Sequence, residues 1–272
     1  MAIETMAGLL LRVPGVTGVL LGGSRARGDH RPDSDTDLGV YYRGPLDLAR
    51  LESLAADIVG GPVDIAGPGE WGPWVNGGAW LVRDGVHVDW ILRDLDRVRR
   101  VWHDCAEGRY EIGYQPGHPL GFWSPCYAGE VALGRLLADP SGELGDLRRQ
   151  ASTYPEPLRS ALAAAAWEAD FSTQIAGQAA PRGDVLYVSL CLSRAIGVLV
   201  QALFAYHRRW CLNEKGALAA VEGMPAAPAD FTRRARALLG HPGTTAGELT
   251  VSVASAAALV TEVRAVLTDS GR

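Results

Sequence analysis

The sequence is poor in features that would place it in several common protein classes. It has four cysteines in 272 residues, and none forms a CxxC pair, which argues against a disulfide scaffold and against the usual zinc sites. The start of the chain carries Glu4 and a short apolar run at residues 7–11, without the cationic lead of a signal peptide. We therefore expect a cytoplasmic protein with reduced thiols.

Long apolar runs and concentrated positive charge are also missing. The most apolar stretch, residues 185–204, is interrupted by Ser189, Ser193, Arg194 and Gln201, so we expect no membrane span. The net charge is −5 and no basic stripe stands out, which argues against a nucleic-acid-binding track. The acidic balance would suit a small polycationic substrate, or it reflects ordinary solubility. With 47% hydrophobic and 21% charged residues, the composition is that of a globular protein.

The most informative stretch is residues 18–42, GVLLGGSRARGDHRPDSDTDLGVYY. An apolar strand ends at Gly22, Gly23 and Ser24, and Asp35 and Asp37 then lead into a second apolar run. Side chains two residues apart in an extended chain point the same way, so both carboxylates share one face. Paired carboxylates suit a hard divalent ion such as Mg²⁺. Backbone N–H groups at the Gly-Ser turn suit a phosphate.

The Gly-Ser pair, about ten residues before Ser-Asp-x-Asp and an apolar strand, resembles the signature of the DNA polymerase beta-type nucleotidyltransferases. Within that superfamily the chain is most similar to the aminoglycoside (streptomycin/spectinomycin) and lincosamide nucleotidyltransferases. The resemblance implies ATP as co-substrate and two Mg²⁺ ions held by Asp35 and Asp37. It assigns the triphosphate to Gly23, Ser24, Ser34 and either Arg25 or Arg27. The competing interpretation is a solvated turn beside an ordinary hairpin end.

A third carboxylate is expected from a later hairpin, AWLVRDGVHVDWIL, in which Asp84-Gly85 is a strong two-residue turn signal. Asp89 lies in the middle of the returning apolar strand, where an unpartnered carboxylate is costly. The resemblance implies a third metal-binding carboxylate on such a strand, and Asp89 matches it in order and context. Asp64, on a shorter expected strand, is the rival. Alternatively, Asp89 forms a structural ion pair with an arginine such as Arg93.

Three further assignments come from outside these strands. Trp71 and Trp74 lie in a Gly-rich loop at residues 67–78; their rings either stack on an adenine or a substrate ring, or attach the loop to the body of the protein. The resemblance places Lys215, in the segment WCLNEKGALAAVEGMP, at a lysine that contacts the nucleotide's phosphates. It also makes Glu130 a candidate general base, the competing interpretation being an exposed helical glutamate.

The pattern of apolar residues predicts an α+β fold: a nucleotidyltransferase domain with a small mixed sheet flanked by helices at residues 1–112, and an all-helical domain at residues 113–272 that closes the active site. A run of Gly, Pro and aromatic residues at 110–125 suggests this boundary. Expected strands are residues 16–21, 38–42 and 63–65, besides the hairpin. Expected helices are residues 3–13, 46–59, 94–107, 126–138, 141–151, 155–179, 184–210, 214–222, 229–239 and 246–267.

Together these features predict an adenylyltransferase that moves AMP from ATP to a hydroxyl of a small molecule such as an aminoglycoside-like antibiotic and releases pyrophosphate. Two alternatives stay open: a protein AMP-transferase of antitoxin type, and a catalytically silent nucleotide-binding protein. The fused helical domain argues against the first, and the presence of three carboxylates argues against the second.

Overall fold

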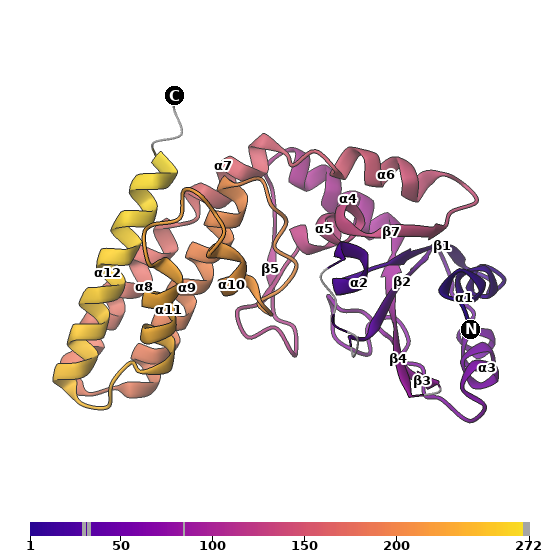
Figure 1. Ribbon diagram of the computed structural model, residues 1–272, viewed down its shortest axis with the longest axis horizontal. Coiled ribbons are helices and arrows are strands. Elements are labelled where there is room, and N and C mark those ends of the chain that lie inside the picture. Colours follow the sequence, from indigo (N-terminus) through magenta and orange to yellow (C-terminus); the bar gives the residue numbers. More distant parts are fainter. Residues whose placement is uncertain (29–30, 32–33, 84, 269–272) are drawn as a thin grey trace. The chain divides into compact units, whose positions relative to one another are not determined.

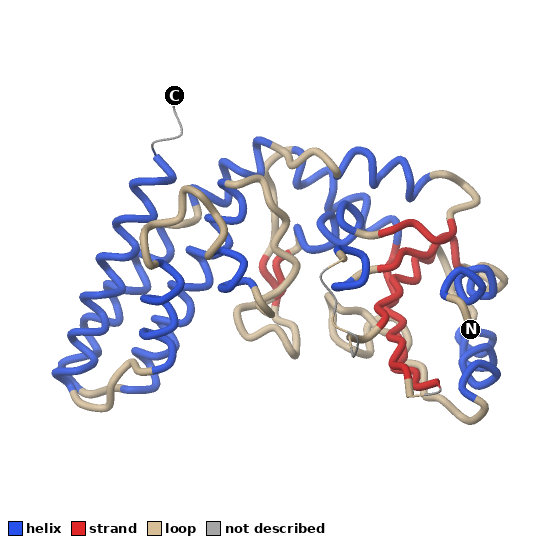
Figure 2. Tube along the Cα trace, in the orientation of Figure 1, coloured by secondary structure: helices blue, strands red, loops and turns tan. Residues whose placement is uncertain are grey.

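A computed structural model describes residues 1–28, 31, 34–83 and 85–268. It divides into two compact units: unit 1 comprises Met1–Cys105 and Tyr110–Thr153, and unit 2 comprises Ala106–Arg109 and Tyr154–Arg272. This division differs from the expected boundary at residues 112/113, because the segment up to Thr153 packs with the sheet. Figure 2 shows strands in unit 1 and helices in both units. The predicted fold class, a mixed sheet with helices followed by a helical region, is confirmed.

Unit 1 is built on a mixed sheet. In the described part of the chain it has five strands in the order β3-β4-β2-β1-β7. Only the β2–β4 pair is parallel; the other neighbours are antiparallel. The strands are β1 (Val16–Leu21), β2 (Thr36–Tyr42), β3 (Gly78–Arg83), β4 (Val86–Asp94) and β7 (Arg135–Ala138). A separate small hairpin pairs β5 (Ile112–Gly113) with β6 (Phe122–Trp123).

Helices α1 (Ile3–Leu10) and α3 (Leu48–Val59) cover one face of the sheet (Figure 1). Alternate strand residues point into this core, including the fully buried Trp90, whose indole N–H donates to the sulfur of Met6 at 3.4 Å. The intervening strand residues point to the second face. On that face Tyr41 and Arg93 are buried, with 1% and 4% of their surface exposed. The remaining helices of unit 1 are α2 (Gly23–Arg27), α4 (Leu95–Ala106), α5 (Pro125–Leu133) and α6 (Glu143–Ala151).

Capping residues explain where two of the predicted helices begin and end. The Asp47 carboxylate accepts the Arg50 backbone N–H at 2.9 Å at the start of α3, and Gly60, with φ +81°, ends that helix. Asp184 caps α9 (Val185–Tyr206) in the same way, through the Tyr187 N–H at 3.1 Å. The hairpin between β3 and β4 also forms as predicted, although Asp84 of its turn lies outside the described residues.

Two predicted elements of unit 1 are wrong. Residues 126–138 do not form one helix: α5 ends at Leu133, Gly134 is extended, and β7 pairs with the edge of β1. A Cβ at Gly134 would lie 2.8 Å from the Glu130 carbonyl oxygen, so the turn out of the helix requires glycine. Residues 63–65 do not form a strand; an isolated bridge between Ala66 and Gly78 occurs instead.

Unit 2 contains helices packed around α9 (Val185–Tyr206), which is flanked by α7, α8 and α12. The predicted helix at residues 155–179 is two helices, because the chain tightens to i→i−3 hydrogen bonds at Ala166, Glu168 and Ala169. The other elements are α7 (Glu156–Ala164), α8 (Trp167–Ala179), η1 (Ala180–Arg182), α10 (Ala217–Val221), α11 (Phe231–Gly240) and α12 (Ala246–Thr268).

Two helices of unit 2 pass a length-and-composition test for membrane spans, contrary to the sequence expectation. They are α9 and α12, with mean hydropathies of 1.8 and 1.5 over the tested windows. In α9, 67% of the window is buried inside the protein, compared with 33% in α12. The apolar composition of α9 is therefore accounted for by its central place among the helices that surround it.

Candidate functional site

The parallel pairing of β2 with β4 brings two of the predicted carboxylates together. Asp37 and Asp89 are direct partners in the register, and both are half-buried. Register partners point to the same face of a sheet, so the two carboxylates lie side by side on the face away from α1 and α3. The rival Asp64 is exposed in an irregular segment and has no comparable partner in the sheet.

The third predicted metal ligand, Asp35, is exposed and lies just before β2. Its loop is attached to α2 through Arg25, whose Nε and Nη2 donate to the Ser34 carbonyl at 3.1 and 2.7 Å and whose Nε also reaches the Asp35 carbonyl at 3.2 Å. The Ser34 hydroxyl accepts the Arg31 backbone N–H at 2.9 Å. In this structure Arg25 and Ser34 thus shape the loop that carries Asp35.

The described residues contain no group of three or more His, Cys, Asp or Glu side chains arranged to hold a metal ion. Asp37 and Asp89 nevertheless supply the adjacent oxygen donors that a hard divalent cation prefers. The donor chemistry therefore fits Mg²⁺, and a third carboxylate from Asp35 would require its exposed loop segment to turn toward the pair.

The Gly-Ser turn packs directly against one of these carboxylates. Gly22 donates its N–H to the Asp37 carbonyl at 2.8 Å, and α2 starts at Gly23 with φ +60°. A Cβ at Gly23 would lie 1.7 Å from Oδ2 of Asp37, so a side chain there would displace the Asp37 carboxylate or the turn. Ser24 is half-buried in the same turn and Arg27 is exposed. The sequence signature therefore brings the Gly-Ser turn and the second aspartate into contact.

Glu130 lies in a different environment from the aspartate pair. Its Oε2 and Oε1 accept Nε and Nη2 of Arg93 at 2.7 and 2.8 Å. Arg93 also donates to the Val75 carbonyl at 2.7 Å. Burial lowers the pKa of Arg93, but the charge and hydrogen bonds of Glu130 outweigh burial and raise that pKa overall. Arg93 lies four residues beyond Asp89, about 13 Å along the strand. Its ion pair is with Glu130, whereas the alternative interpretation expected a pair with Asp89.

The two tryptophans of the Gly-rich loop have different roles. Trp74 is 8% exposed and stacks on Phe122 with ring centroids 5.5 Å apart, while the guanidinium of Arg97 lies 4.3 Å from its ring. The side-chain oxygen of Gln115 accepts the Trp74 backbone N–H at 2.9 Å. In this structure Trp74 therefore attaches the Gly-rich loop to the body of unit 1.

Trp71 instead stacks on Trp80 of β3, with ring centroids 4.2 Å apart and planes inclined by 19°. Trp80 is 67% exposed and was not among the predicted site residues. Its signal was present in the sequence, because it alternates with Ala79 and Leu81, which are buried on the opposite face.

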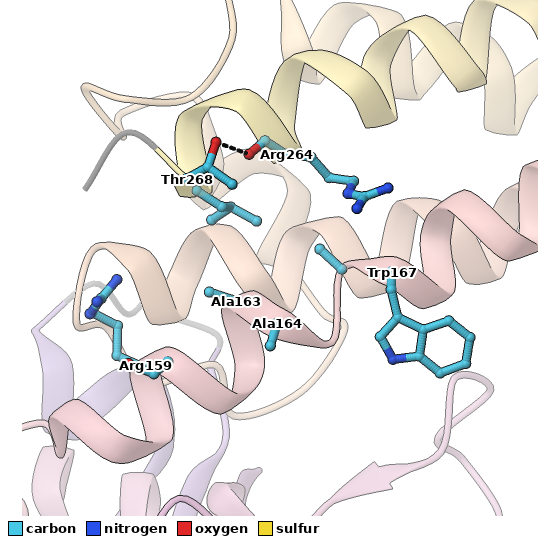
Figure 3. A pocket seen from close by; sticks show the side chains of 9 residues that line it. Arg159, Ala163, Ala164, Trp167, Arg264 and Thr268 are labelled. Carbon is cyan, nitrogen blue, oxygen red and sulfur yellow. Dashed lines mark hydrogen bonds between the residues drawn. The ribbon is translucent and has the colours of Figure 1, made fainter. Parts of the chain in front are cut away.

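Lys215 belongs to unit 2, where it is exposed in the turn before α10 and donates its backbone N–H to the Asn213 side chain at 2.8 Å. Unit 2 also has a pocket of about 300 Å³ between α7 and the end of α12 (Figure 3). Its lining includes Arg159, Trp167 and Arg264 and contains no carboxylate. All of its lining residues belong to unit 2.

Comparisons with known proteins agree with this geometry. Residues 6–89 match the family model of the nucleotidyltransferase domain, a span that contains both the Gly-Ser turn and all three aspartates. Residues 129–215 match a domain of unknown function, DUF4037, which runs from unit 1 into unit 2. A search of curated proteins returned no match.

Among solved structures, a nucleotidyltransferase-like protein from Exiguobacterium sibiricum is similar in fold, with a TM-score of 0.50 and 13% identity over 100% of this chain and 81% of the other. The domain match supports a nucleotidyltransferase domain at residues 6–89 and, in general terms, nucleotidyl transfer from a nucleoside triphosphate; the solved structure shows a similar fold.

Proposed function

We propose that the protein is a Mg²⁺-dependent adenylyltransferase that transfers AMP from ATP to a hydroxyl group of a small molecule and releases pyrophosphate. The proposal is carried by one observation, the side-by-side placement of Asp37 and Asp89 next to a turn in which a side chain on Gly23 would collide with the Asp37 carboxylate. Two adjacent half-buried carboxylates repel each other, and a divalent cation bound by both would offset that repulsion. Metal-dependent phosphoryl transfer uses such a pair.

The chain's own groups would divide the work as follows. Backbone N–H groups at Gly23 and Ser24 would bind the β- and γ-phosphates, while Arg25 holds the loop of Asp35 through carbonyl contacts. Arg27 is an exposed cation that would stabilise the negative charge of the departing pyrophosphate. Asp35, Asp37 and Asp89 would hold the ions, which supply Lewis acidity and neutralise charge when bound.

In the transfer itself, the acceptor oxygen forms a bond to the α-phosphorus and the bond from that phosphorus to the bridging oxygen breaks, so pyrophosphate leaves with the electron pair. We assign the hydroxyl proton to Asp89 rather than to Glu130. Asp89 lies beside Asp37, where the reacting groups would be bound, whereas Glu130 is held in a two-point ion pair with Arg93.

Label transfer tests this proposal. The protein would be incubated with α-labelled ATP, Mg²⁺ and a panel of aminoglycosides, lincosamides and cell extract, and the label followed into small molecules and protein. We expect label in a small molecule, and we expect Asp37→Asn to abolish transfer with the circular dichroism spectrum unchanged. Asp57→Asn, which removes an exposed carboxylate on α3, is the matched control and should retain full activity.

Other outcomes of this assay would redirect or end the proposal. Label found only in protein would indicate the protein AMP-transferase alternative. Full transfer by the Asp37→Asn variant would show that the site is assigned to the wrong residues.

A further inference from the structure

The second face of the unit 1 sheet carries an exposed aromatic surface beside the carboxylates. Trp80 is the direct partner of Asp89 in the antiparallel pairing of β3 with β4, so its side chain lies on the carboxylate face, with the two Cβ atoms about 5 Å apart. Trp80 is 67% exposed. An indole exposed beside two carboxylates offers an apolar face on which a ligand ring can stack.

This indole is held in place rather than merely exposed. Trp71 stacks on it at 4.2 Å, and the Trp71 backbone carbonyl accepts the side-chain amide of Gln115 at 2.5 Å. A Cβ at Gly78 would lie 2.9 Å from the Trp71 ring and 1.8 Å from the Trp90 carbonyl oxygen, so glycine permits the ring to approach the strand. The Trp71–Trp80 pair is therefore organised before any ligand binds.

The order of groups across the sheet indicates which part of the substrates the Trp71–Trp80 pair would bind. Gly22 bonds to the backbone of Asp37, Asp37 pairs with Asp89, and Asp89 pairs with Trp80. The Gly-Ser turn, to which the proposed function assigns the phosphates, and the aromatic pair thus lie on opposite sides of the two carboxylates, on neighbouring strands about 4.8 Å apart. An in-line displacement requires the attacking oxygen and the departing pyrophosphate to be on opposite sides of the phosphorus.

We propose that the Trp71–Trp80 pair is the acceptor-binding surface, and that the acceptor is a small cyclic molecule whose flat face stacks on Trp80 while one of its hydroxyl groups faces Asp89. This inference rests on the proposed function. It further restricts the acceptor to molecules with a ring, and it assigns specificity to a residue outside the nucleotide-binding signature. The same surface would otherwise hold the adenine base, which the experiment separates.

The first test is steady-state kinetics with the labelled acceptor found in the panel, extended by simple glycosides, hydroxylated aromatics and a low-molecular-weight filtrate of cell extract. Trp80→Ala should raise the acceptor KM by about tenfold, the loss of one good stacking contact, and leave the ATP KM unchanged. Trp80→Phe should restore most of the affinity. Val82→Ala, on the same face of the same strand, is the matched control and should leave both constants unchanged.

Two kinetic results would overturn the inference. An unchanged acceptor KM in Trp80→Ala would remove the aromatic pair from acceptor binding, and a rise in the ATP KM alone would show that it binds the adenine. Both leave the proposed transfer reaction intact. Failure of the proposed function is a different result: no label transfer by the wild-type protein and no binding of α,β-methylene-ATP.

A second test does not require turnover. The indole N–H signal of Trp80 would be assigned in a nitrogen-15 NMR spectrum by its absence in Trp80→Ala. Compounds of the extended panel should shift this signal in the presence of Mg²⁺ and α,β-methylene-ATP, whereas the nucleotide alone should leave it in place. If no compound shifts it, or if the nucleotide alone does, the inference is contradicted.

Discussion

Replacing Gly23 by alanine tests whether the Gly-Ser turn and Asp37 act as one unit. The new Cβ would lie 1.7 Å from Oδ2 and 2.8 Å from Cγ of Asp37, where ordinary contact begins near 3.4 Å. The carboxylate or the turn must therefore move by about 1.7 Å. Because a misplacement of about 1 Å can cost a hundredfold in rate, we expect at least that loss in kcat.

The stability effect of this substitution can be separated from its effect on the site. Gly23 has φ +60°, and an alanine in the left-handed region costs about 1–2 kcal/mol. Gly28, at the end of the same helix, has φ +78° and nothing within 4 Å of its added Cβ. Gly28→Ala should therefore show similar strain, without the clash and without loss of activity.

The assay is label transfer from α-labelled ATP, with urea unfolding of each variant measured in parallel. We expect the two variants to differ in activity by about a hundredfold. Gly23→Ala should also unfold at a lower urea concentration than Gly28→Ala, because only the first variant carries the clash with Asp37. Equal activity of Gly23→Ala and Gly28→Ala would refute the reasoning, because it would show that the close approach to Asp37 has no bearing on the reaction.

Three further predictions concern other contacts. Glu130→Ala should lower the free energy of unfolding by about 3–5 kcal/mol, measured by urea denaturation, because it leaves the buried Arg93 charge without its carboxylate; a loss below 1 kcal/mol would contradict the structural role of this pair. Burial raises the pKa of Cys105 from 9.0 to about 12, so its contribution to stability is fully present below pH 9 and falls as the pH rises from there to 12; native Cys105 should resist iodoacetamide at pH 8, as peptide mass mapping would show, and rapid labelling would contradict its burial. Asp184→Ala should cost about 1 kcal/mol in the same urea assay by removing the cap of α9, whereas Asp184→Asn should cost little; equal losses would show that capping is not the cause.

Local signals predicted much of unit 1. The first strand is at residues 16–21 as expected, because its apolar run lies between a turn and the Gly-Gly pair. The β3–β4 hairpin also follows from short-range chemistry, as does the cap at Asp184 in unit 2. These features depend on residues within a few positions of one another, which is the range over which sequence patterns are informative.

Features that depend on long-range pairing were missed. The edge of β1 recruits residues 135–138 as a strand, although their sequence alone reads as helix. The break between α7 and α8 lies in an alanine run with no Gly or Pro to mark it. In the same way, the attachment of Arg93 to Glu130 and of Trp71 to Trp80 joins residues far apart in the chain, so neither pair could be read from spacing.

The adjacency of Asp37 and Asp89 is the central claim, and divalent metal binding tests it most directly. Mn²⁺ would be added with α,β-methylene-ATP and the bound fraction measured by electron paramagnetic resonance, for the wild-type protein, the Asp37→Asn/Asp89→Asn double variant and Asp57→Asn. The account predicts nucleotide-dependent Mn²⁺ binding in the wild type and in Asp57→Asn, and its loss in the double variant. Undiminished Mn²⁺ binding by the double variant would contradict it.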